Sequence, residues 1–141
     1  MRPNVNNAGR GERDEFSAWR ALQRATDKRR ADIIADTVGH PQGAISVEEL
    51  DYLNPELSDD SIRRHLKILQ EVGVVEEIEV PKGERLREFP FKFYMLTDDA
   101  RDLFDQNNLF PQEAWQRQYA AVEKTPRIKV VEEMPRPSKT E

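Results

Sequence analysis

The stretch LSDDSIRRHLKILQEVGVV, residues Leu57 to Val75, predicts a helix with one buried face and one basic face. Residues of an α-helix advance by about 100° each, so Ile62, Leu66 and Leu69 share a narrow apolar stripe that must face a core. Arg64 and Lys67 then point the opposite way, toward solvent. The pattern indicates a helix of about 14 residues whose outer side carries positive charge and hydroxyl groups.

Both ends of this helix carry termination signals. Ser58 stands at the N-cap position, and Gly73 follows the helix where positive φ is required. Leu69 and Val74 are spaced for the hydrophobic contact of a Schellman motif.

A second, shorter helix precedes it. Ser46 and Glu49 have the S-x-x-E spacing of a capping box, and Leu50 and Leu53 supply a buried face. The pair 54–55, Asn-Pro, ends this helix. Two helices joined by a tight turn within thirty residues form a helix-turn-helix.

The second helix resembles the recognition helix of ArsR-type winged-helix transcription regulators. In that pattern a hydroxyl-bearing start leads to Arg-His-Leu-Lys, then Leu, then Gly followed by apolar residues. The matching positions are Ser58, Ser61, Ile62, Arg64, His65, Leu66, Lys67, Leu69, Gly73 and Val74. The resemblance covers about residues 21–104 and implies a DNA-binding repressor. It implies an α+β, mainly helical winged helix-turn-helix, here with additional N- and C-terminal helices.

A hairpin is expected after the recognition helix. Val74 to Val80 is predicted as one strand and Phe89 to Leu96 as the other, in which Phe89, Phe91, Phe93 and Met95 alternate with other residues and form an aromatic core face. The segment PKGERLRE, residues 81–88, is the tip of the hairpin and forms the wing.

The proposed interface with double-stranded DNA has two basic elements. An exposed Arg pair on the second helix of such a motif can enter the major groove and donate to guanine. We expect the contacts to be made by Ser58, Ser61, Arg63, Arg64 and Lys67 of the helix and by Lys82, Arg85 and Arg87 of the wing. The alternative is a winged helix that binds a protein partner, which the formal charge of −5 favours.

The remaining segments divide the chain. Residues 1–12 are predicted to be a disordered arm, with DNA contact as the alternative; residues 13–106 form the winged helix-turn-helix with its leading helix. A helix within 107–125 is predicted to dimerise the protein, followed by a tail, 126–141, whose path stays open. Two apolar stripes would be uncovered in one chain, so a homodimer interface is expected at Phe16, Trp19, Leu22, Trp115, Tyr119 and Val122.

Composition excludes several kinds of chemistry. The chain has no cysteine and two histidines, so disulfides and thiolate metal sites are excluded and no metal-binding spacing is present. We therefore expect that the protein is not an enzyme and binds no cofactor or metal. The sequence does not identify an effector ligand. No membrane span or signal peptide is visible, and a cytoplasmic protein is expected. The acidic, cysteine-free, Arg-rich composition resembles proteins of halophilic archaea.

Overall fold

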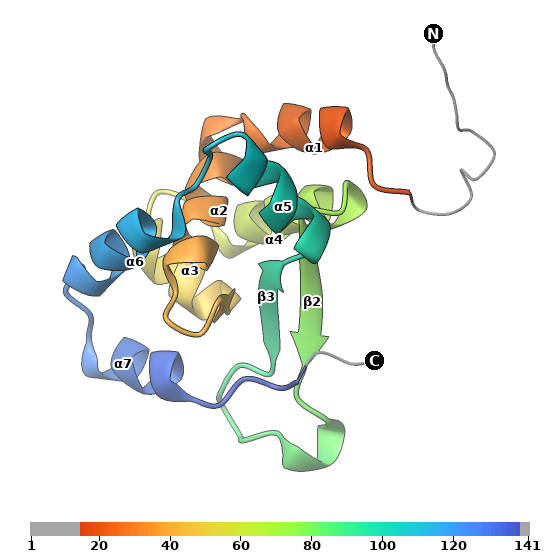
Figure 1. Cartoon of the computed structure of the whole chain (residues 1–141). Helices are drawn as coiled ribbons and strands as arrows, with labels where there is room; N and C mark the ends of the chain where they lie inside the picture. Colours follow the sequence, from red (N-terminus) through yellow and green to blue (C-terminus); the bar gives the residue numbers. More distant parts are fainter. Residues whose placement is uncertain (1–14, 139–141) are drawn as a thin grey trace, which may run out of the picture.

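The computed structural model describes residues 15–138 and contains the predicted winged helix-turn-helix. Seven helices pack beside a small three-stranded sheet that lies at one side of the molecule, so the α+β, mainly helical class is confirmed (Figure 1). In chain order the elements are α1 (Ala18–Ala25), α2 (Lys28–Gly39), β1 (Ala44–Ile45), α3 (Val47–Leu53), α4 (Asp59–Glu71), β2 (Val75–Glu79), the 3-10 turn η2 (Lys82–Glu84), β3 (Lys92–Leu96), α5 (Asp98–Gln106), α6 (Gln112–Ala121) and α7 (Pro126–Glu133). Within residues 15–138 no helix is long and apolar enough to cross a membrane.

The two helices of the helix-turn-helix, α3 and α4, begin as the sequence predicts. The capping box of α3 is present: Glu49 N–H donates to Ser46 Oγ at 3.1 Å, and Ser46 N–H donates to Glu49 Oε1 at 3.0 Å. Ser58 Oγ accepts from Ser61 N–H at 3.1 Å and caps α4. These bonds satisfy donors that a helix start otherwise leaves without partners.

The end of α4 is a Schellman motif. Gly73 has φ +75°, Val74 N–H donates to Leu69 O at 2.9 Å, and Gly73 N–H donates to Gln70 O at 3.0 Å. Ile62, Leu66 and Leu69 are fully buried in the main hydrophobic cluster. The opposite side of α4 therefore faces outward.

The sheet is antiparallel with the order β1-β3-β2. The register pairs Ile45 with Tyr94 and Ile78 with Phe93, and Phe93 is fully buried. The segment between β2 and β3 is the wing, as predicted.

The second strand of the hairpin is shorter than the aromatic alternation predicts. The ladder of β2 with β3 ends at Lys92, beyond which Val80 N–H donates to Phe91 O, and Pro90 has no N–H with which to continue. Phe89 and Phe91 are consequently only half-buried, and arginine side chains cover their rings: Arg127 lies 4.4 Å from the Phe89 centroid and Arg85 lies 3.8 Å from that of Phe91.

The homodimer was expected to cover the apolar stripe of Trp115, Tyr119 and Val122, but helix α2 of the same chain covers most of it. α6 packs on α2 so closely that a Cβ at Gly39 would lie 2.6 Å from Trp115 O. Tyr119 is 5% exposed, and its ring lies 5.3 Å from that of His40. A single chain therefore already covers Trp115 and Tyr119, and a dimer is not needed to bury them. Val122, the C-cap of α6, is exposed.

The leading helix is also placed differently from the prediction. Ser17 caps α1, so Phe16 precedes the helix and packs against Gly73, while Leu22 packs on the main core. Trp19 is 70% exposed. The predicted arm, residues 1–12, lies outside the described residues.

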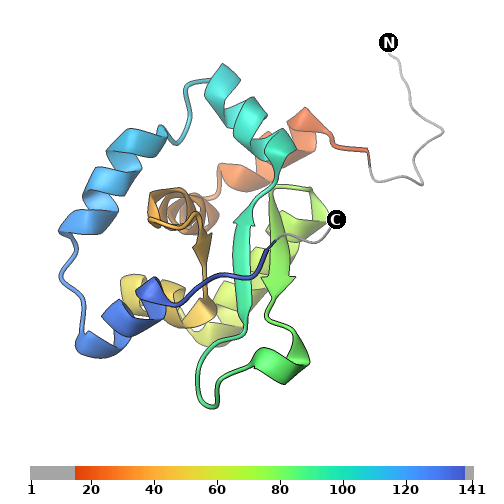
Figure 2. The ribbon, with the colours of Figure 1, turned by 60° about the horizontal axis from the view of Figure 1, so that its bottom comes forward.

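The segment after residue 125 begins with a helix. Thr125 Oγ1 accepts from Ile128 N–H at 3.2 Å, and Pro126 occupies the first turn, where its missing N–H costs nothing. Ile128 and Val131 of α7 are buried. Figure 2 shows α7 beside α3, with the chain that follows crossing toward the sheet.

Candidate nucleic-acid interface

The outer face of α4 carries three cationic side chains that are free to meet a ligand. Arg63, Arg64 and Lys67 are exposed, and Ser61 is half-buried beside them. None of the three cations forms a side-chain hydrogen bond or ion pair with another residue of 15–138. Cations held on a rigid helix without intramolecular partners can donate to an anion or a base edge at little cost in rearrangement.

The wing contributes two similar side chains and one different one. Lys82 and Arg87 are exposed and likewise make no ion pair within the described chain. Arg85 is engaged inside the wing: its Nε donates to Val80 O at 2.9 Å, its Nη2 donates to Glu79 Oε1 at 2.9 Å, and its guanidinium lies over Phe91. Arg85 thus shapes the wing, whereas Lys82 and Arg87 face solvent.

The acceptor side of Ser58 is occupied by its capping bond. Its hydroxyl hydrogen remains available to donate, and the residue is exposed at the start of α4. A hydroxyl at this place can bind a phosphate oxygen together with the helix N-terminus.

Carboxylates border the basic face. Asp59 and Asp60 occupy the first turn of α4, where the helix dipole favours them. Burial first, and then the neighbouring charge of Asp59, raise the pKa of Asp51. Asp51 and Asp59 line a groove of about 440 Å³ between the start of α4 and the base of the wing, with Val47, Glu48, Arg63, Phe89, Pro90, Phe91 and Lys92 as the other lining residues.

His65 links the recognition helix to α2. Its Nδ1 lies 3.3 Å from Arg30 Nη1. Burial, followed by the positive charge of Arg30, lowers the pKa of His65. A neutral imidazole whose Nδ1 accepts from the guanidinium fits this geometry, so this contact joins α4 to α2.

A buried polar cluster behind the sheet was not predicted. His40, the C-cap of α2, is fully buried, and its Nε2 lies 2.7 Å from Glu49 Oε2. Arg136 Nη2 donates to Glu49 Oε1 at 2.9 Å, and Arg136 Nε donates to Ala44 O at 3.0 Å. No sequence signal joins residues so far apart; only the fold shows that Glu49 is buried and that its charge therefore needs a partner.

Clusters of metal-ligating side chains were sought among residues 15–138. Within residues 15–138 no group of three or more His, Asp or Glu side chains could hold a metal ion.

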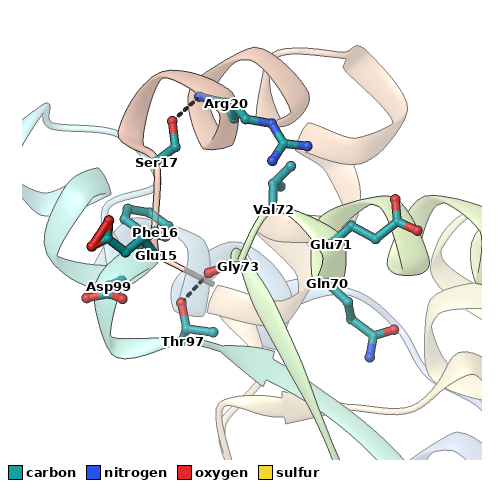
Figure 3. Close-up of a pocket in the computed structure, with 10 residues that line it drawn as sticks. All are labelled: Glu15, Phe16, Ser17, Arg20, Gln70, Glu71, Val72, Gly73, Thr97 and Asp99. Atoms are coloured by element: carbon teal, nitrogen blue, oxygen red, sulfur yellow. Dashed lines mark hydrogen bonds between the residues drawn. The ribbon is translucent and has the colours of Figure 1, made fainter. Parts of the chain in front are cut away.

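A cavity of about 630 Å³ lies between the start of α1 and the end of α4 (Figure 3). It combines Arg20 with the carboxylates of Glu15, Glu71 and Asp99, and Thr97 Oγ1 donates to Gly73 O at 2.6 Å beside it.

The comparisons with known proteins agree with the fold. No family model and no curated protein matches the chain. A solved structure, described as a protein with a GntR superfamily winged-helix-turn-helix domain from Halomicrobium mukohataei, is similar over 98% of this chain and 95% of its own. The two are 25% identical, with a TM-score of 0.76.

This likeness places the chain among winged helix-turn-helix proteins over nearly its whole length. The expected assignment to the ArsR type is not supported, because the similar structure carries a GntR superfamily description. The recognition-helix pattern is common to related winged-helix families, so the residues alone did not separate them.

Proposed function

We propose that this protein is a sequence-specific regulator of transcription that binds double-stranded DNA. The observation that carries the proposal is the set of exposed, unpaired cations on α4 and the wing of an otherwise acidic chain. The winged helix-turn-helix domain of the similar structure supports the same class.

The recognition helix is proposed to enter the major groove. Its 13 residues span about 20 Å at 1.5 Å per residue, and a helix fits a groove about 12 Å wide. Arg64, opposite the buried stripe, donates to guanine O6 and N7, while Ser61 and Arg63 contact neighbouring base edges. Lys67 also contacts base edges, and Ser58 binds a phosphate at the start of the helix.

The wing is proposed to hold the adjoining backbone or minor groove. Lys82 and Arg87 make these contacts, because their charges are not used within the described chain. Arg85 was predicted as a third contact; its bonds to Val80 and Glu79 give it the separate task of keeping the wing in shape.

The proposal extends to the direction of regulation, the source and the oligomeric state of the protein. Repression by blocking polymerase is proposed because the recognition helix resembles that of ArsR-type regulators. A halophilic archaeal source is proposed because the similar structure comes from such an organism. We also propose a homodimer, formed through α1, where Trp19 presents its exposed ring.

Selection of bound sequences from random duplex, in both low and molar salt, tests the function. Arg64→Ala should then lose about 1 to 3 kcal/mol on the selected site and relax the preference at one base pair. The matched control is Arg87→Ala, which should weaken all duplexes alike and lower the salt slope by about one unit.

Two results would overturn this proposal. In the first, Arg64→Ala discriminates among single-base variants of the selected DNA site as the wild type does. In the second, no duplex is selected at either salt concentration. The second result would favour a winged helix that binds a protein partner. The net charge of −5 and the acidic first turn of α4 are consistent with that alternative.

A further inference from the structure

Arg127, in the first turn of α7, uses all the donors on one side of its guanidinium. Nε donates to Glu48 Oε2 at 2.8 Å, and Nη2 donates to Glu48 Oε1 at 3.0 Å and to Glu88 O at 2.7 Å. The same guanidinium lies 4.4 Å from the centroid of the Phe89 ring. Paired, planar contacts of this kind fix both distance and orientation.

The partners of Arg127 belong to two separate parts of the proposed DNA-binding unit. Glu48 is in the first turn of α3, the first helix of the helix-turn-helix. Glu88 and Phe89 lie on the returning arm of the wing. Glu88 has φ +65°, a conformation that residues other than glycine seldom adopt, and its carbonyl points to Arg127.

The wing has no other hydrogen bond of this range within the described residues, although Leu86 and Pro90 border a pocket that Met134 and Pro135 also line. Among the described residues, the remaining hydrogen bonds of residues 81–90 are local: Glu84 N–H to Pro81 O, Phe89 N–H to Leu86 O, and those of Arg85 to Val80 and Glu79. Local bonds set the shape of a hairpin tip. They do not set its position relative to α3 and α4.

The groove between the wing and the start of α4 is where this position matters. Glu48 and Phe89, both held by Arg127, line it together with Arg63 of the recognition helix. The width of this groove sets the spacing between the recognition helix α4 and the wing, the two basic elements that would bind one duplex. A shift of the wing changes that distance, and two contacts on a rigid duplex cannot both form if it is wrong.

We propose that Arg127 is a positioning residue that holds the wing at the spacing from the recognition helix at which both bind the same DNA. This inference rests on the proposed function and extends it, because it makes α7 a part of the DNA-binding unit without any contact of its own to the duplex. Lysine cannot replace Arg127, since one ammonium group cannot keep the two-oxygen contact and the carbonyl contact in plane.

The test compares Arg127→Ala and Arg127→Lys with Lys129→Ala in the full chain. Lys129 is exposed on the same helix, and its ammonium group has no partner among residues 15–138, so Lys129→Ala changes the net charge by the same amount as Arg127→Ala, whereas Arg127→Lys keeps the charge. Amide hydrogen exchange of the free protein reports the wing directly. Both Arg127 variants should speed exchange at Phe89 by about tenfold, and Lys129→Ala should not.

Affinity for a selected duplex is the second measurement. Each Arg127 variant should bind about tenfold more weakly than Lys129→Ala, as expected for losing the joint use of two contacts. In a chain that already carries Lys82→Ala and Arg87→Ala, the same Arg127 substitutions should change affinity by less than about twofold, because the wing no longer contributes.

The two measurements separate the possible failures. Unchanged wing exchange in both Arg127 variants overturns the positioning role, whatever the DNA result. Equal losses of affinity with and without the wing cations overturn it as well, because the effect would then not pass through the wing. A wild type that selects no duplex overturns the proposed function instead, and the exchange experiment then still decides whether Arg127 holds the wing.

Discussion

Arg136→Ala should be among the most destabilising single changes in this chain. The side chain of Arg136 is 6% exposed and that of Glu49 is not exposed. Arg136 donates to Glu49 Oε1, to Ala44 O, and through Nη1 to Val131 O at 2.8 Å and Met134 O at 2.9 Å. It also lies 4.3 Å from the centroid of the Phe93 ring.

The size of the effect follows from what is left behind. Arg136→Ala leaves the buried carboxylate of Glu49 with His40 but without its arginine partner, and breaking a buried ion pair in this way costs about 3 to 5 kcal/mol. The unfolding entropy is about 2.1 cal/mol/K per residue, or about 0.25 kcal/mol/K for about 120 ordered residues. The melting temperature should therefore fall by about 12 to 20 °C.

The pH dependence identifies Glu49 as the cause. Burial alone raises the pKa of Glu49, but the bond from His40 and the charges of His40 and Arg136 outweigh it and keep this pKa below its ordinary 4.5. In the wild type the stability from Glu49 is present above pH 4.5 and is lost as the pH falls through the lower folded pKa. Without Arg136 one of the influences that lower the pKa of Glu49 is lost while the bond from His40 remains, so the folded pKa rises toward 4.5 and the stability that Glu49 contributes above that pH becomes smaller.

The difference in unfolding free energy between wild type and Arg136→Ala should therefore be largest near pH 7 and narrow toward pH 4. Urea denaturation at both pH values measures it. Arg136→Met is the matched control for side-chain volume, and it should show the same pH trend. The reasoning would be refuted if Arg136→Ala melted within about 3 °C of the wild type. It would also be refuted if the difference in unfolding free energy between the two proteins were equal at pH 7 and pH 4.

Three further predictions use other parts of the fold. Gly73→Ala should cost about 1 to 3 kcal/mol in urea denaturation, because φ is +75° and the new Cβ would lie 3.1 Å from the Phe16 ring; Gly83→Ala, with open space around it, should change stability by less than about 0.5 kcal/mol. Burial raises the pKa of Asp36 to about 6, although a bond from Asn54 opposes it, so its contribution is present below pH 3.8 and is lost as the pH rises through about 6. Asp36→Asn should remove that loss, and thermal melts from pH 4 to pH 8 that decline as steeply as those of the wild type would contradict it. If α1 forms a dimer, Trp19→Glu should sediment as a monomer while Val130→Glu, at another exposed apolar position, does not; a monomeric wild type would end the dimer proposal.

The sequence predicts those parts of the fold that local chemistry decides. Ser46 with Glu49, Ser58, and Gly73 with Val74 each act within five residues, so the boundaries of α3 and α4 follow from them directly. The wing is predicted for the same reason, from a glycine and charged residues between two apolar runs. The aromatic alternation from Phe89 extends the second strand too far, because alternation does not show where the partner strand stops pairing.

The parts that long-range contacts decide were not predicted. α7 has its own signal in Thr125 and Pro126, but the run is short and nothing local shows that α3 will receive it. Arg85 and Arg87 look alike in the sequence; only the fold shows that Val80 and Glu79 engage one of them. The likeness to a GntR superfamily domain also lies beyond what the recognition-helix pattern can distinguish.

The contact between Glu49 and Arg136 joins positions 87 residues apart in the chain. Closing so long a loop costs entropy before any contact repays it, whereas the helix-turn-helix can assemble from neighbouring segments. The winged helix should therefore form first on the folding pathway, and the Arg136 segment should dock after the rate-limiting step. Interactions made that late leave the folding rate almost unchanged and act on unfolding, so the docked segment serves mainly to prolong the lifetime of the folded state.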